Sequence, residues 1–121
     1  MDSSRLYIRD LKIACIIGCN PDERIRTQTL VLNLVLELGS MKARQTDSLE
    51  DTIDYSVLSE ILTHQAKQSS YFTLECLAQN LLQTCQNFDS NIRSIEMDLE
   101  KPQCLPNARS AGVRIHFTKR P

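Results

Sequence analysis

The sequence predicts an α+β fold in which a four-stranded antiparallel sheet carries two antiparallel helices on one face. Apolar and polar residues alternate in two segments toward each end of the chain, which is typical of strands buried on one side. Between them, two segments repeat their apolar residues at helical spacing and are joined by a short polar turn. The element order is therefore ββααββ, and 121 residues are enough for one domain, 1–121, with a single core.

The first two strands are predicted at residues 6–17 and 29–38. The apolar parity of the first strand changes once near Arg9-Asp10, which indicates a β-bulge. The second strand has five leucines on one parity and mixed residues on the other, so we expect one buried face and one half-exposed face. The segment 18–24 between them is polar and rich in turn residues, and it is predicted to form a long loop.

The two helices follow a polar connection at 39–54, which has a predicted helical turn at 41–44. Asp54 or Ser56 is expected to cap the first helix, and Thr73 is expected to cap the second. The predicted buried stripe of the first helix is Val57, Leu58, Ile61 and Leu62. That of the second is Leu74, Leu77, Ala78, Leu81, Leu82, Cys85 and Phe88.

The last two strands are predicted at 94–100 and 111–118, with an irregular connection because it contains two prolines. The inward parity of Ile95, Met97 and Leu99 continues onto Lys101, so a lysine is expected at the inner end of a strand. The outward parity carries charged residues on both strands, which makes that face too polar for a dry interface. Closing several such sheets edge to edge around a wet lumen would cover their edges, and we therefore expect a cyclic homo-oligomer.

Composition excludes several classes of partner. The net charge is -1 and the basic residues are scattered, so nucleic-acid binding has no electrostatic support. No apolar run approaches the length of a membrane span, and the five cysteines contain no C-x-x-C pair. We expect a cytoplasmic protein with reduced thiols that does not bind membranes.

Four side chains occupy unusual places: Glu23 in a loop, Tyr55 at a helix start, Glu75 in a buried first turn, and Lys101 at a strand end. Each has an ordinary explanation, and for Glu75 this is favourable interaction with the helix dipole. Alternatively, Glu75 could accept two parallel N–H bonds from a flat, guanidine-like ligand edge.

The two histidines give no metal site. His64 is predicted on the exposed side of its helix and His116 on the polar sheet face. Neither has a cysteine or carboxylate at ligand spacing, and we assign no metal and no cofactor.

A family resemblance bears on these alternatives. It rests on Gly18-x4-Glu23-x4-Gln28, Asp51-Thr52-Ile53-Asp54-Tyr55, Leu74-Glu75-x-Leu77-Ala78, Lys101-Pro102 and Gly112-Val113. In this order and spacing the motifs resemble dihydroneopterin aldolase across essentially the whole chain. The resemblance implies the tunnelling fold, with subunits assembled as tetrameric rings, usually stacked as octamers, and active sites between subunits.

The same resemblance implies a role for each residue. Leu74, through its backbone, and Glu75 would bind the pterin ring of 7,8-dihydroneopterin, an intermediate of folate synthesis. Glu23 would contact the hydroxyls of its side chain. Tyr55, from a neighbouring subunit, would lie near the pterin and exchange a proton. Lys101 would be the general acid/base for metal-free retro-aldol cleavage, which makes the enzyme a lyase.

Two alternatives stay open. Dihydroneopterin triphosphate 2'-epimerase has the same scaffold, and Arg24 and Arg26 in the Glu23 loop could contact a triphosphate. A non-catalytic, ring-forming pterin-binding protein would need Glu75 but not Lys101.

Overall fold

The computed structural model describes residues 2–120; Met1 and Pro121, the ends of the predicted domain, lie outside them. The strands are β1 (Ser4–Cys15), β2 (Gln28–Leu38), β3 (Ile92–Pro102) and β4 (Ser110–Thr118). The helices are α1 (Ala43–Thr46), α2 (Tyr55–Lys67) and α3 (Leu74–Phe88), with 3-10 turns η1 (Pro21–Arg24) and η2 (Leu49–Asp51). The predicted ββααββ order is confirmed. The short helical turn of the first connection lies two residues later than predicted.

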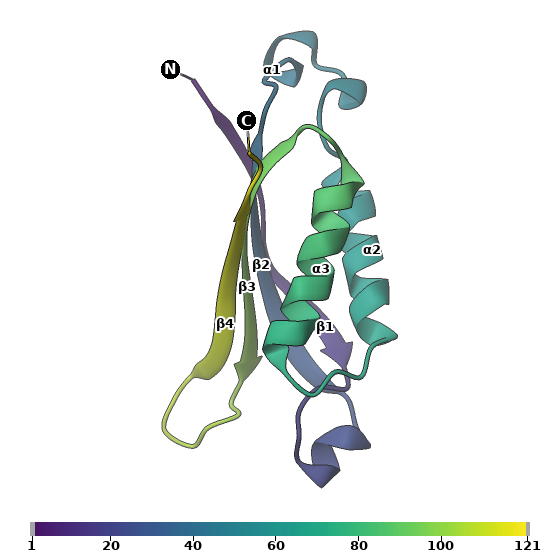
Figure 1. Ribbon diagram of the computed structural model, residues 1–121, viewed down its shortest axis with the longest axis vertical. Coiled ribbons are helices and arrows are strands. Elements are labelled where there is room, and N and C mark those ends of the chain that lie inside the picture. The colour runs from purple at the N-terminus through teal and green to yellow at the C-terminus, as the bar shows by residue number, and fades with distance from the viewer. Residues whose placement is uncertain (1, 121) are drawn as a thin grey trace.

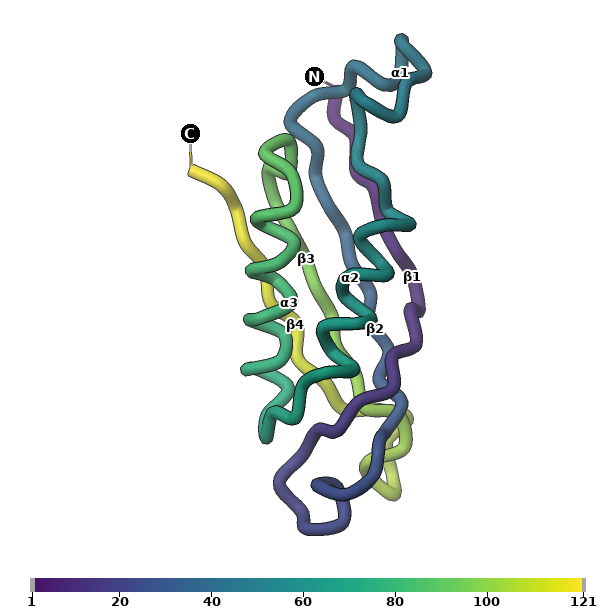
Figure 2. Tube along the Cα trace, turned by 90° about the vertical axis from the view of Figure 1, so that its right-hand side faces the viewer, coloured from purple at the N-terminus to yellow at the C-terminus, as the bar shows by residue number. Residues whose placement is uncertain are grey.

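The four strands form one antiparallel sheet in the order β1-β2-β3-β4. Helices α2 and α3 lie side by side on one face of the sheet, α2 over β1 and α3 over β3 and β4 (Figures 1 and 2). Between the two layers is an apolar core to which the inward parity of β2 contributes Leu30, Leu32, Leu34 and Leu36, all fully buried. The predicted two-layer α+β fold is therefore confirmed.

The predicted bulge in β1 is present. The β1–β2 register shifts between Ile8 and Leu11, and Asp10 has a left-handed backbone with φ of 58°. The Asp10 N–H donates to Asn33 Oδ1 at 2.8 Å, so the side chain of the neighbouring strand satisfies the disrupted backbone. The bulge lets the apolar residues on both sides of it face the helices although they differ in parity.

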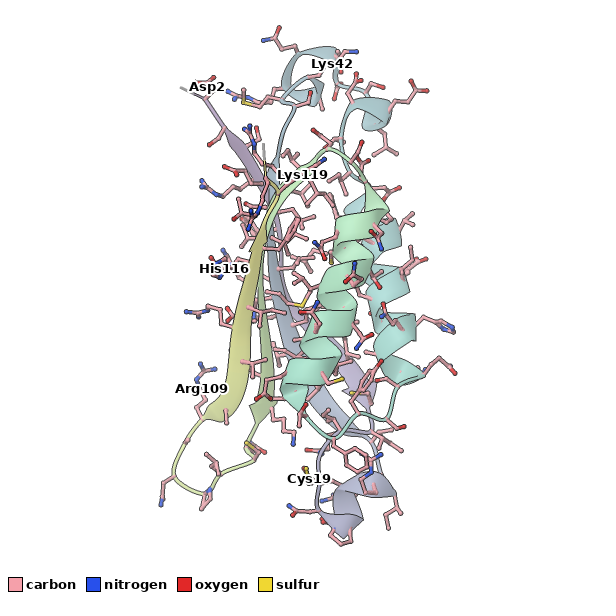
Figure 3. All side chains as sticks on the ribbon, in the orientation of Figure 1. Asp2, Cys19, Lys42, Arg109, His116 and Lys119 are labelled. Carbon is pink, nitrogen blue, oxygen red and sulfur yellow. The ribbon has the colours of Figure 1, made fainter. Side chains whose placement is uncertain are left out.

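Within residues 2–120, no helix lies on the second face of the sheet. Figure 3 shows His116 and Arg109 on this side, away from α2 and α3. Cross-strand ion pairs lie along it: Arg114 Nε contacts Asp98 Oδ1 at 2.6 Å, and Arg5 Nη2 lies 3.7 Å from Glu37 Oε2. The predicted polar face is thus present in the single chain.

The first predicted helix stripe is partly wrong. Leu58, Leu62 and Ala66 are buried, whereas Val57 and Ile61 are 43% and 39% exposed. The buried residues are spaced four apart, and a residue one position earlier is rotated by about 100° around the helix, away from the sheet. Asp54 is the N-cap, because its carboxylate accepts from the N–H groups of Ser56 and Val57.

The cysteines fall into two groups. Cys15 and Cys85 are buried, and burial raises the pKa of their thiols to about 11 and about 12. Cys19, Cys76 and Cys104 are exposed. Among residues 2–120, no helix is long and apolar enough to cross a membrane.

Candidate functional site

The carboxylate of Glu23 lies at the centre of a polar network that joins three segments of the chain. Lys101 Nζ, at the end of β3, donates to Glu23 Oε2 at 3.1 Å. Gln28 Nε2 donates to the same oxygen at 3.0 Å and to the carbonyl of Ile17 at 2.6 Å. The backbone N–H of Asn20 donates to Glu23 Oε1 at 3.1 Å. Glu23 and Lys101, 78 positions apart in sequence, are therefore in direct contact.

Gly18 explains the spacing of the Glu23 motif. Its φ is +122°, a conformation that side chains disfavour, and a Cβ at this position would overlap the Glu23 carboxylate. Glycine at this position thus leaves room for the carboxylate of Glu23, five positions later. Gln28, the first residue of β2, donates to the Oε2 atom of the same carboxylate.

The electrostatics of the pair favour an ionised acid. The pKa of Glu23 is lowered, chiefly by the hydrogen bond from the Asn20 backbone and then by those from Lys101 and Gln28. The side chains of Lys101 and Glu23 are only 16% and 17% exposed. The inward position predicted for Lys101 from strand parity is confirmed.

The start of α3 lies at the same end of the molecule as the end of β3 and the η1 loop (Figure 1). Thr73 is the N-cap, as predicted, and its hydroxyl accepts from the Cys76 N–H at 3.2 Å. Leu74 is half-buried, but Glu75 is exposed, so the prediction of a buried Glu75 is wrong for the single chain. Helical spacing places Glu75 between apolar positions, yet the sheet covers only the side of α3 that bears Leu77, Ala78 and Leu81.

Backbone contacts connect the Glu23 loop to the start of α3. The Gly18 N–H donates to the carbonyl of Tyr71 at 3.3 Å, and Cys19 Sγ donates to the carbonyl of Phe72 at 3.5 Å. Figure 3 shows Cys19 at this lower end of the molecule. A helix N-terminus with a free carboxylate, Glu75, therefore lies beside a loop that carries a second carboxylate, Glu23.

Tyr55 is not brought to this end. It begins α2, which runs antiparallel to α3, and its side chain is 57% exposed. The 13 residues of α2 extend about 20 Å, which separates Tyr55 from the other candidate residues of the same chain. Within one chain, Glu23 contacts Lys101, and the loop that carries Glu23 lies beside the turn that leads into Leu74 and Glu75. Tyr55 lies at the other end of the molecule.

The arrangement has two chemical capabilities. A carboxylate and an ammonium group in contact can exchange protons with a bound hydroxyl. The first turn of α3 offers N–H groups without intrahelical partners next to a carboxylate, which suits a flat ligand edge that both donates and accepts. A cavity of about 510 Å³ lies elsewhere, at the other end of the sheet, lined by residues such as Asn91, Arg93 and Lys119.

Three contributions were missed by reasoning from the sequence. Gln28 and Gly18 were recognised as motif positions, but no role was predicted for either. The Asn20 N–H was not considered at all, although an asparagine followed by proline at a turn and by glutamate three residues later is the signal of a capping box.

The fold and the site define a two-layer ββααββ protein with an acid/base pair and a carboxylate-bearing helix start at one end of its sheet. The family model described as dihydroneopterin aldolase (FolB) matches residues 6–116. The chain belongs to the dihydroneopterin aldolase family.

The chain is also similar to individual proteins and to solved structures. The chain is 31% identical over 114 residues to a folic acid synthesis protein of Dictyostelium discoideum, covering 94% of this chain and 17% of that protein. It is 20% identical to dihydroneopterin triphosphate 2'-epimerase of Pseudomonas aeruginosa, covering 93% of this chain and 90% of that one. The crystal structure of Escherichia coli dihydroneopterin aldolase in complex with neopterin matches with a TM-score of 0.89 at 21% identity, covering 94% and 98% of the two chains, and shows the shared fold.

Proposed function

We propose that this protein is a dihydroneopterin aldolase, which cleaves 7,8-dihydroneopterin into 6-hydroxymethyl-7,8-dihydropterin and glycolaldehyde. The observation that carries this proposal is the contact between Lys101 and Glu23, held by Gln28 and the Asn20 N–H beside the start of α3. A retro-aldol reaction needs a proton removed from a hydroxyl and a proton delivered to carbon, and this pair is placed to handle protons.

The geometry supports the following proposed roles. Leu74, through its backbone, and Glu75 bind the amino-pyrimidine edge of the pterin at the first turn of α3. Glu23 accepts from the side-chain hydroxyls, and Lys101 acts as the general acid/base, directly or through water. As the bond between the first and second side-chain carbons breaks, the electron pair moves into the C=N of the dihydropterin ring. The ring system is thus the electron sink, and the reaction as proposed proceeds through neither a lysine Schiff base nor a metal ion.

Tyr55 enters this proposal from a second chain. Its exposed ring lies at the other end of α2 from the Lys101 pair, and β1 and β4 are the edge strands of a sheet whose second face is open. We infer that subunits join edge to edge into rings, stacked as octamers or not, so that Tyr55 of one subunit completes the site of its neighbour and exchanges a proton with the reacting carbon.

Triphosphate epimerase activity is the second candidate, because the Pseudomonas aeruginosa relative carries that name. Binding a triphosphate calls for free basic groups near Glu23. Arg24 instead donates to three backbone carbonyls, and Arg26 Nη2 pairs with Asp22 Oδ2 at 3.3 Å. The donors of Arg24 are thus occupied, whereas the Arg26 pair is exposed and weak, so the loop offers a triphosphate only one readily available cation, which supports the unphosphorylated substrate. A non-catalytic pterin-binding role is disfavoured because it gives the Lys101 and Glu23 pair no use.

The test is product analysis. The protein is incubated with 7,8-dihydroneopterin and, separately, with its triphosphate, and the products are resolved by chromatography. We expect hydroxymethyldihydropterin and glycolaldehyde from the first substrate. An epimerised triphosphate without cleavage of either substrate would establish the second candidate, and unchanged substrates would leave only the binding role.

A further inference from the structure

Arg24 makes more polar contacts with distant segments than its place in a surface loop suggests. Its Nη1 donates to the carbonyls of Gly18 and Tyr71, both at 3.1 Å, and its Nη2 donates to the carbonyl of Ser70 at 2.6 Å. Its Cζ lies 4.0 Å from the centroid of the Phe72 ring. The planar guanidinium group suits this arrangement, because it donates in several fixed directions while one face stacks on an aromatic ring.

These contacts join the two parts of the candidate site. Gly18 is the residue against which the Glu23 carboxylate rests, so it belongs to the part that carries the acid/base pair. The turn 70–72 leads directly into Thr73 and Leu74, so it belongs to the part that carries the helix start. Arg24 contacts both parts, and Tyr71, to whose carbonyl it donates, lies 47 positions away in sequence.

We propose that Arg24 is a positioning residue that fixes the distance between the side-chain half of the site, Glu23 with Lys101, and the ring half, Leu74 with Glu75. This inference rests on the proposed function and adds to it. A ligand that spans both halves gains from their fixed separation, because neither half has to be ordered when it binds. A ligand that occupies only the ring half gains nothing from it.

Two ligands separate these cases. Neopterin carries the trihydroxypropyl chain and spans both halves, whereas pterin has the same ring edge without the chain. In Arg24→Met the aliphatic stem is kept and the donors are lost. We expect this variant to bind neopterin about tenfold more weakly and pterin within about twofold of the wild type. Arg24→Lys keeps the charge but lacks the planar fork, and we expect it not to restore neopterin binding.

Arg26→Met is the matched control. Arg26 lies in the same loop, and its ion pair with Asp22 stays within that loop, so its loss should leave the binding of both ligands unchanged. Because Arg24→Met could fold poorly, Phe72→Leu provides a milder variant: Phe72 is 60% exposed, and its loss removes only the stacking surface of the guanidinium group. It should show the same selectivity between ligands, about twofold to threefold in size.

The measurements are titration calorimetry with each ligand and a thermal unfolding midpoint for each variant. Equal losses for neopterin and pterin, or no loss for either in Arg24→Met, would overturn the positioning role while leaving the proposed function intact. If the wild-type protein binds neither ligand, the proposed function fails, and the inference fails with it.

Discussion

The two ends of the molecule are held together in different ways. At the end that carries the candidate site, the bonds connect segments far apart in sequence, such as Lys101 with Glu23 and Arg24 with Tyr71. At the opposite end, the segment 42–54, which carries α1 and η2 and leads into α2, bonds mainly within itself: Thr46 Oγ1 donates to Asp51 Oδ2 at 2.6 Å, only five positions away. Longer-range bonds also occur there, since Arg44 pairs with Asp2 and the adjacent Ser40 N–H donates to Asn91 Oδ1. Figure 3 shows Lys42 at this far end and Cys19 at the site end.

This difference indicates how the site forms. The site end takes its geometry only once the sheet and both helices are in place, because its partners come from β2, β3 and the turn before α3. The far end positions Tyr55 by a local helix cap and leaves its ring exposed. In the proposed function, one end carries most of the candidate site residues and the other presents Tyr55 alone, as expected if neighbouring chains share sites.

Removing Lys101 should have the largest effect on the site end. We expect Lys101→Met to lower the single-turnover rate with 7,8-dihydroneopterin by about 10²–10⁴, because a general acid/base is lost, with substrate binding changed far less. Rapid-quench kinetics and calorimetric binding separate the two quantities. Lys67→Met, on the exposed surface of α2, is the matched control. A near-normal rate in Lys101→Met would mean that the lysine only fills the strand end.

Replacing Glu75 should have the opposite effect, weakening substrate binding far more than the rate of the chemical step. Glu75→Ala removes a carboxylate that accepts charge-assisted bonds from the pterin edge, so we expect substrate binding to weaken by well over tenfold. Isothermal titration with neopterin measures this directly. Glu60→Ala, an exposed acid within α2, should bind normally. Unaltered affinity in Glu75→Ala would reduce Glu75 to a partner of the helix dipole.

Mixing inactive chains tests whether the far end of one chain completes the site end of another. Tyr55→Phe and Glu75→Ala chains are each expected to be nearly inactive alone, the second when the substrate concentration is too low for its weakened binding. After unfolding and refolding together in equal amounts, about a quarter of the sites should combine an intact Tyr55 with an intact Glu75. Activity should recover to that extent if sites lie between subunits. No recovery, or a fully active monomer in sedimentation, would contradict shared sites.

The smallest effect concerns stability and pH. The pKa of Glu23 is lowered below its ordinary value of 4.5, so the folded state prefers the ionised carboxylate more than the unfolded state does. This stabilisation is fully present above the unfolded pKa and is lost as pH falls through the folded one. Thermal unfolding of wild type and Glu23→Gln should therefore differ most near neutral pH and converge in acid. A constant difference across that range would show that the carboxylate charge adds nothing to stability.

Much of this molecule was predictable from periodicity alone. The four strands, both long helices, the caps at Asp54 and Thr73 and the bulge near Asp10 follow from local patterns that the tertiary structure does not override. The position of Lys101 was predictable for the same reason, because strand parity continues to the end of β3.

The remaining features depend on which side of each helix packs against the sheet and on which polar groups meet in the folded chain. Helical spacing could not show that Val57 and Ile61 lie just outside the covered side of α2, or that Glu75 is exposed in a single chain. The charge of Arg24 is visible in the sequence and left a triphosphate contact open as an alternative, whereas its three carbonyl partners come from the fold. Long-range polar contacts of this kind leave no periodic signal.

The bulge in β1 has a consequence for solubility. An edge strand of 12 residues with a continuous row of free backbone groups is a template on which strands of other molecules can add without limit, the first step toward fibrils. The left-handed turn at Asp10 breaks that row near its middle, and Asn33 binds the displaced N–H. An incoming strand must therefore match the interruption, which disfavours indiscriminate strand addition at this edge.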